Sequence, residues 1–196
     1  MTTYKAPLRD MQFVMQDLLN IEKHYQSLPA CEEVNQDLID AILGEARKFS
    51  EEIVAPLNAV GDEQGCQMLD NGEVKTPAGF KEAYQQYVDA GWPSLDQPAA
   101  YGGQDLPMSI GTTVREMTGT ANWSWAMYPG LSQGAMETID EHGSEEQKDM
   151  FMEPLVSGRW TGTMCLTEAH SGTDPVSYTH LTLPTTKALC RSRGWR

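Results

Sequence analysis

Hydrophobic positions recur at helical spacing near the N-terminus. The first set predicts an amphipathic helix, because its members would share one face at 3.6 residues per turn. It comprises Met11, Val14, Met15, Leu18 and Leu19. A second, longer helix is predicted from about Asn35, and Pro56 is expected to kink or stop it before Gly61. Its expected apolar face comprises Leu38, Ile42, Phe49, Ile53 and Leu57.

Turn-forming residues divide the middle of the chain. Residues 66–75 are polar and contain glycine, which predicts a loop. Thr76-Pro77 predicts a helix start that continues to Gly91, since a hydroxyl cap followed by proline is typical of a first helical turn. Residues 92–107 hold enough proline and glycine to exclude a persistent helix or strand. Two further helices are predicted over 109–120 and 124–141.

The clearest helix start lies at Ser144. Its hydroxyl can accept from the Gln147 amide while the Gln147 side chain reaches back, which is a capping box, and Gly158 is expected to end this helix. Over 159–167 the pattern changes to that of an extended strand. A lone strand leaves its backbone hydrogen bonds unpaired, so the sequence is expected to be cut shortly after it.

Composition limits the classes of partner. The chain of 196 residues has 28 acidic and 14 basic residues and a net charge of −14, which argues against nucleic acid or an anionic membrane as its main partner. No apolar run approaches the roughly 18 residues of a membrane span. The four cysteines are scattered without CxxC spacing or nearby histidine pairs, so we expect reduced thiols, no metal site and a cytoplasmic location.

The basic residues near the C-terminus form a separate segment. Residues 176–196 contain four basic and no acidic residues, whereas residues 1–175 carry a net charge of −18. The ten residues Val176–Thr185 resemble the translation of a transposase adapter used in DNA library preparation. A strand-rich natural segment is the alternative, since Val, Tyr and Thr favour strands. We interpret 176–196 as a non-native tail.

One motif has the features of a ligand-binding turn. The predicted strand ends in Met164-Cys165-Leu166-Thr167 and leads into a polar turn that contains Gly172 and Thr173. Such a turn can present hydroxyls and backbone amides to a phosphate or to the edge of a flavin ring. From the residues alone, a surface turn closed by Gly172 remains an alternative.

The motif over 165–174 resembles the signature of the acyl-CoA dehydrogenase family, in which a strand ending in Thr-Glu leads to Gly-Ser/Thr-Asp. Residues 90–92 with 98–103, and 143–160, resemble the loop and the helix that precede it in that family. Asp105 departs from the pattern, because a glycine is usual there. Residues 4–11 and 128–132 resemble the 3-methylmercaptopropionyl-CoA dehydrogenase subgroup, which has an extra N-terminal helical segment.

The resemblance implies a fold and a domain order. The fold class expected is the all-α N-terminal domain of the acyl-CoA dehydrogenase fold, truncated just after the first strand of the central β-domain. The expected domains are an N-terminal helical extension (1–34), the helical N-terminal domain (35–158), the start of the central β-domain (159–175) and the non-native tail (176–196).

The resemblance also implies the chemistry, which is FAD-dependent α,β-dehydrogenation of an acyl-CoA, with a short thioether-containing acyl-CoA as one candidate. The implied FAD-binding residues are Met164, Cys165, Leu166, Thr167, Gly172 and Thr173. Thr173 would also contact the acyl-CoA. The catalytic glutamate belongs to a C-terminal domain, so the chain holds no catalytic residue and is expected to be inactive by itself. Electron-transfer flavoprotein as electron acceptor and a homo-oligomer are implied as partners.

Three alternatives stay open. An acyl-CoA oxidase or a flavin monooxygenase of the same fold would share these residues, and an acidic helical interaction module without catalysis would need none of them. Four residues of the helix over 124–141 and its start are candidates for the acyl pocket, with ordinary helix core as the alternative. They are Trp123, Trp125, Tyr128 and Met136.

Overall fold

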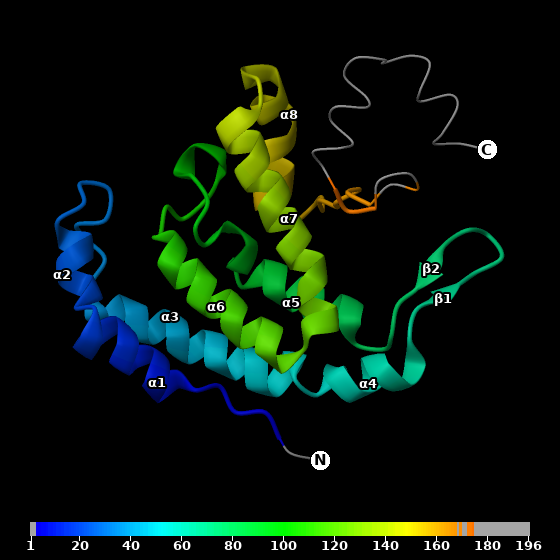
Figure 1. Cartoon of the computed structure of the whole chain (residues 1–196), viewed down its shortest axis with the longest axis horizontal. Helices are drawn as coiled ribbons and strands as arrows, with labels where there is room; N and C mark the ends of the chain where they lie inside the picture. Colours follow the sequence, from blue (N-terminus) through cyan, green and yellow to red (C-terminus); the bar gives the residue numbers. More distant parts are fainter. Residues whose placement is uncertain (1–2, 168, 170–171, 175–196) are drawn as a thin grey trace. The chain divides into compact units, whose positions relative to one another are not determined.

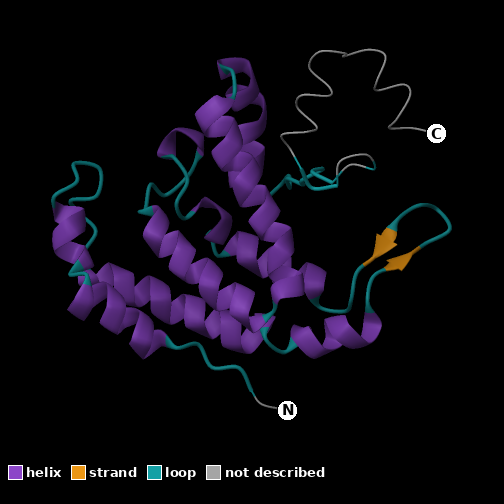
Figure 2. Cartoon of the chain, viewed as in Figure 1, coloured by secondary structure: helices purple, strands orange, loops and turns teal. Residues whose placement is uncertain are grey.

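A computed structural model describes residues 3–167, 169 and 172–174, and the predicted tail over 176–196 lies outside this range. The chain divides into two units, Met1–Gly162 and Thr163–Arg196. The first is built almost entirely of helices (Figures 1 and 2). Its α-helices are α1 (Leu8–Gln12), α2 (Ile21–Gln26), α3 (Gln36–Lys48), α4 (Leu57–Gln64), α5 (Phe80–Asp89), α6 (Met108–Ala121), α7 (Trp123–His142) and α8 (Glu145–Val156). Two π-helical segments, η1 (Phe13–Leu18) and η2 (Phe49–Val54), continue α1 and α3, and two 3₁₀ turns, η3 (Trp92–Ser94) and η4 (Ala99–Tyr101), lie between α5 and α6.

The helix ends follow their local sequence signals. The Asn35 side chain accepts from the Leu38 amide at the start of α3. Ser144 and Gln147 form the predicted capping box at the start of α8, with bonds of 3.2 and 2.9 Å. Gly158 follows α8 with φ of +71°, a conformation that favours glycine. The predicted helix start near Asn35, the capping box at Ser144 and the helix end at Gly158 are confirmed.

The predicted apolar faces are only partly correct. Met11 and Met15 are buried, but Val14, Leu18 and Leu19 are largely exposed. Residues 13–18 form π-helical turns, so the 3.6-residue spacing that was assumed for them does not apply. In the longer helix the core side is one position away from the predicted face, and its buried residues are Ile39, Leu43, Ala46, Ser50 and Val54.

The segment between α4 and α5 was predicted incorrectly in two respects. Residues 66–75 form a short hairpin and not a simple loop, with β1 (Gln67–Met68) antiparallel to β2 (Val74–Lys75). Helix α5 begins at Phe80 and not at Pro77, because Gly79 has φ of +83° and interrupts the helical dihedral angles. The Phe80 amide instead closes a separate turn onto the Pro77 carbonyl.

The strand predicted over 159–167 is not formed. Residues 161–167 adopt neither helix nor strand. A strand requires hydrogen bonds to a neighbour, and the described backbone of this segment is not part of any ladder. The Gly162 amide donates instead to the Ser132 hydroxyl, at 3.1 Å.

Three buried clusters hold the helical unit together. The first surrounds Ile39 and Met117 and joins the N-terminal helices to α3 and α6. The second surrounds Val54 and Trp125, where η2, α5 and α7 meet, and the third surrounds Met152 between α7 and α8. The N-terminal extension therefore shares the core of the helical domain.

Candidate functional site

The predicted cofactor turn lies in the second unit. It brings Thr167 and Thr173 together, with 3.3 Å between their hydroxyl oxygens. Gly172 has φ of +59°, a conformation that allows the backbone to turn tightly between them. Both hydroxyl side chains are exposed. The turn can therefore present two adjacent hydroxyls to a ligand.

The other predicted residues of the turn are also exposed. Met164 and Leu166 are exposed apolar side chains. Cys165 is an exposed free thiol, because 161–167 has no sheet to cover it. An exposed apolar surface beside paired hydroxyls suits a planar ring with a polar edge, so the residues present fit a flavin.

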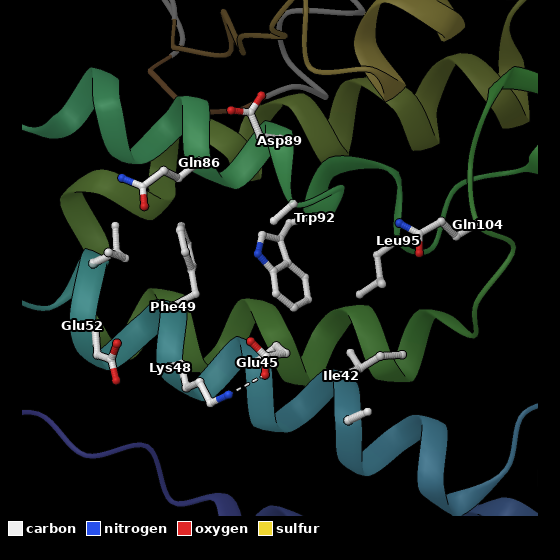
Figure 3. Close-up of a pocket in the computed structure, with 13 residues that line it drawn as sticks. Ile42, Glu45, Lys48, Phe49, Glu52, Gln86, Asp89, Trp92, Leu95 and Gln104 are labelled. Carbon is white, nitrogen blue, oxygen red and sulfur yellow. Dashed lines mark hydrogen bonds and ion pairs between the residues drawn. The ribbon is translucent and has the colours of Figure 1, made fainter.

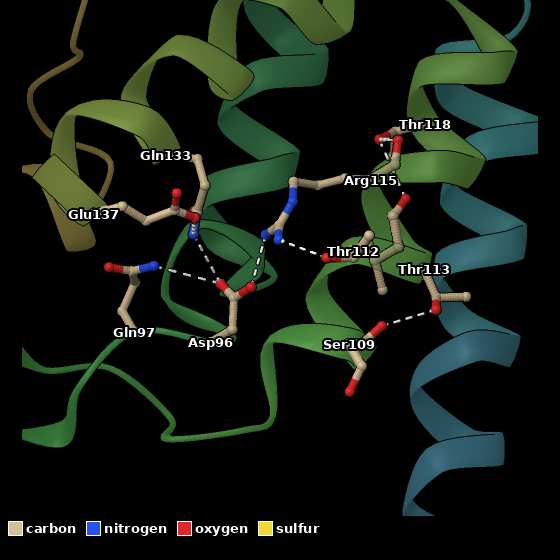
Figure 4. A network of polar contacts seen from close by, with 10 residues as sticks. Asp96, Gln97, Ser109, Thr112, Thr113, Arg115, Thr118, Gln133 and Glu137 are labelled. Carbon is tan, nitrogen blue, oxygen red and sulfur yellow. Dashed lines mark hydrogen bonds and ion pairs between the residues drawn. The ribbon is translucent and has the colours of Figure 1, made fainter. Parts of the chain in front are cut away.

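A buried ion pair fixes the loop between α5 and α6 (Figure 4). Asp96 Oδ2 accepts from Arg115 Nη1 of α6 at 2.7 Å, and the Asp96 side chain is only 1% exposed. Gln97 and Gln133 donate to the other carboxylate oxygen, at 3.4 and 3.2 Å. Asp96 thus ties the loop to both α6 and α7.

The same loop explains the unusual Asp105. Its φ is +52°, in the left-handed region that favours glycine. Its carboxylate accepts from the Ala99 amide at 2.9 Å, which supports the conformation locally. The departure from the family pattern therefore retains the backbone that a glycine would adopt.

The candidate residues for an acyl pocket fall into two groups. Trp125 and Met136 are buried in the core, which confirms the alternative interpretation for these two. Trp123 and Tyr128 are 68% and 51% exposed. Tyr128 packs edge-on against Tyr84, with ring centroids 5.0 Å apart, and its hydroxyl donates to Thr161.

Burial makes four tyrosines less acidic, which are Tyr4, Tyr25, Tyr84 and Tyr87. It raises the pKa of Tyr84 to about 12, with a smaller effect from Tyr128, and it also raises the pKa of Tyr87. Because the folded chain holds the Tyr84 proton more tightly than the unfolded chain does, this contribution to stability is complete below pH 10 and is lost as the pH rises toward 12.

We therefore expect Tyr84→Phe to reduce the alkaline sensitivity of folding. The free energy of unfolding, measured by urea titration, should fall less between pH 10 and 12 in Tyr84→Phe than in the parent chain. The variant loses a hydrogen bond to the Gly158 carbonyl at all pH values, so the slope with pH is the informative quantity. Equal slopes in the two chains would contradict the prediction.

An open groove lies between α3 and α5, and we term it the α3–α5 groove (Figure 3). Its volume is about 790 Å³. Its apolar floor comprises Ile42, Phe49, Ile53, Trp92 and Leu95. The sequence signal for it was the apolar face assigned to the longer helix, whose members Ile42, Phe49 and Ile53 border this groove. Trp92 and Leu95 were missed, because the groove is assembled from segments far apart in the sequence.

Two further features are absent from the described residues. No group of three or more histidine, cysteine, aspartate or glutamate side chains there could hold a metal ion. Within the same residues, none of the helices combines the length and the apolarity that a membrane crossing requires.

The family model and the individual relatives that match this chain agree on one family. Residues 37–159 match the N-terminal domain of acyl-CoA dehydrogenases. The chain is 40% identical over 172 residues to 3-methylmercaptopropionyl-CoA dehydrogenase of Ruegeria pomeroyi, an alignment that covers 88% of the chain and 29% of that relative. It is 31% identical to a butyryl-CoA dehydrogenase of Syntrophomonas wolfei, with 97% of the chain and 32% of the relative covered.

A more distant relative also matches most of the chain but less than a third of its own length. The broad-specificity linear acyl-CoA dehydrogenase of Mycobacterium tuberculosis is 28% identical, with 89% of the chain and 28% of the relative covered. The chain thus spans about 30% of the length of these curated relatives.

Proposed function

The chain belongs to the acyl-CoA dehydrogenase family, and from this premise we propose that it forms the N-terminal part of an enzyme for FAD-dependent α,β-dehydrogenation of an acyl-CoA thioester. The observation that supports a flavin site in this chain is the pairing of Thr167 and Thr173 at 3.3 Å in the turn that carries the family motif. Bound FAD would supply the two-electron oxidant for the reaction.

We propose a short acyl-CoA with a thioether, such as 3-methylmercaptopropionyl-CoA, as the substrate. The support is the 40% identity to the Ruegeria enzyme of that name. The catalytic base would come from residues outside this chain, so the 196-residue chain should show no turnover. Electron-transfer flavoprotein as acceptor and a homo-oligomeric assembly complete the proposal.

The residues of the turn would have two roles: some would contact the cofactor, and one would stabilise the charge that develops on it. Met164, Cys165, Leu166 and Gly172 would form the surface against which the flavin lies. The Thr167 hydroxyl would donate a hydrogen bond where negative charge develops during reduction. Thr173 would bind FAD and the acyl-CoA.

The overall proposal is tested in a protein that contains this chain and has the full length of its relatives. A bound yellow flavin that is bleached anaerobically by 3-methylmercaptopropionyl-CoA supports the dehydrogenase. Rapid reoxidation of that reduced flavin by oxygen would favour an oxidase or a monooxygenase. Absence of flavin after purification and added FAD would leave the acidic interaction module as the function.

Threonine substitutions test the two roles in that protein. Thr167→Val retains the side-chain shape, so FAD should still bind, but flavin reduction in stopped flow should slow on the order of 100-fold, because a preorganised donor is lost. Thr173→Val should instead raise the dissociation constant for FAD or acyl-CoA. If Thr167→Val is reduced at the parental rate with parental FAD affinity, Thr167 has only a structural role.

A further inference from the structure

The chain that follows α8 stays attached to the helical unit before it reaches the cofactor turn. The Tyr84 hydroxyl of α5 donates to the Gly158 carbonyl at 3.3 Å. Two residues later the Trp160 amide donates to the Pro154 carbonyl of α8 at 2.9 Å. These bonds hold residues 158–160 against α5 and α8.

The next two residues are held by α7. The Gly162 amide donates to the Ser132 hydroxyl at 3.1 Å, and the Tyr128 hydroxyl donates to Thr161 Oγ1 at 3.3 Å. Ser132 lies one turn after Tyr128 on the same helix and is only 6% exposed, so water competes little for its hydroxyl. We term these two bonds the α7 anchor.

Gly162 fits against α7 without room for a side chain. A Cβ atom there would lie 2.5 Å from the Ala135 Cβ and 3.1 Å from the Leu131 carbonyl oxygen. Only a glycine main chain can approach the helix this closely. The place of Gly162 is therefore defined by close packing as well as by its bond to Ser132.

The α7 anchor lies at the point in the sequence where the helical unit ends. Gly162 is the last residue of that unit, and Thr163 begins the unit that contains the cofactor turn. Thr167 comes five positions after Gly162, and residues 161–167 form no helix or strand that would fix it independently. The starting point of the segment that carries Thr167 is thus set by α7.

We propose that Ser132 is a positioning residue for the dehydrogenation, because it holds the Gly162 amide and so fixes the start of the segment that places the Thr167 hydroxyl. The inference rests on the proposed function, in which Thr167 donates a hydrogen bond where charge develops on the flavin. Such a donor contributes only while it is correctly placed, and a small displacement is enough to slow the reaction. Ser132 is buried in the helical unit and acts through Thr167.

The anchor itself is tested in the 196-residue chain by amide hydrogen exchange. Ser132→Ala should speed exchange of the Gly162 amide on the order of fivefold, because the amide loses a hydrogen bond of ordinary strength. Ser157→Ala is the control, since the Ser157 hydroxyl donates to the Pro154 carbonyl and not to residues 161–162. Exchange of the Gly162 amide in Ser157→Ala should equal that of the parent chain.

The effect on chemistry is tested by stopped-flow flavin reduction in a protein that contains this chain and has the full length of its relatives. Ser132→Ala should slow reduction on the order of fivefold, and Ser157→Ala should leave the rate unchanged. Thr161→Val removes the bond from Tyr128 while retaining the side-chain shape, so it should also slow reduction and provides a second variant. Neither Ser132→Ala nor Thr161→Val should slow reduction further in a Thr167→Val background, because both act through the Thr167 hydroxyl.

The outcomes separate this inference from the function on which it rests. Equal slowing by Ser132→Ala with and without the Thr167 hydroxyl would mean a general structural role and would overturn the proposal. Parental flavin reduction in Ser132→Ala, or unchanged exchange of the Gly162 amide, would also overturn it. A protein without flavin, or parental reduction in Thr167→Val alone, would contradict the proposed function and with it the role of Ser132.

Discussion

Gly103→Ala should destabilise the helical unit by about 3 kcal/mol, because the backbone leaves no room for a side chain at this position. A Cβ atom on Gly103 would overlap the carbonyl carbon and oxygen of Gln97 and would lie 2.8 Å from the Pro98 oxygen. Those carbonyls are engaged in the loop, since they accept from the amides of Asp105 and Gly103 at 3.0 Å. Relief of the overlap therefore requires movement of the main chain.

Gly44→Ala provides the matched control, with the opposite sign. Gly44 lies within α3, and a Cβ there would meet no atom within 4 Å. Alanine should stabilise the chain by about 0.5 to 1 kcal/mol, because glycine loses more backbone entropy in a helix. Urea unfolding followed by circular dichroism measures both changes. A Gly103→Ala variant within about 0.5 kcal/mol of the parent would show that the loop relaxes without cost.

The helix ends could be predicted because their causes are local. Asn35, Ser144 and Gly158 act within one turn of the residues that they stabilise, so the sequence contains the whole interaction. The start of α5 was misplaced by the same kind of reasoning, because Thr76-Pro77 is also compatible with a separate turn.

The helix faces could not be assigned, because burial depends on what lies opposite. The longer helix carries two apolar stripes, one around Ile39 and Leu43 and one around Phe49 and Ile53. The first packs into the core and the second borders a groove, and neither spacing nor composition distinguishes them. The strand over 159–167 failed for a related reason, since strand propensity has no effect without a pairing strand.

The candidate site was predicted from family resemblance more than from physics. The residues alone favoured a surface turn over a cofactor turn, and only the folded structure brings the Thr167 and Thr173 hydroxyl oxygens to 3.3 Å from each other. The contacts of Asp96 with Arg115 and Gln133 were not foreseen. They join residues 19 and 37 positions apart, and a single charged residue in a loop gives no signal of its partner.

Arg115→Met should destabilise the helical unit by about 3 kcal/mol, because it removes the cation from a buried carboxylate. The Asp96 side chain is 1% exposed, so water cannot replace the lost partner, and only the amides of Gln97 and Gln133 would remain. The expected value lies at the low end for broken buried pairs, since Arg115 itself is 31% exposed. Urea unfolding of the purified variant measures it.

The loss of stability in Arg115→Met should depend on the burial of the ion pair and not on its length. A second ion pair of the same length, but exposed, distinguishes these two causes. Arg159 and Glu153 are also 2.7 Å apart, but their side chains are 62% and 58% exposed, so Arg159→Met should cost less than about 1 kcal/mol. Asp96→Asn should reduce the penalty of Arg115→Met in the double variant, because a neutral amide needs no cation. Equal costs for the two arginine variants, or strict additivity with Asp96→Asn, would show that the buried charge does not govern the stability of this loop.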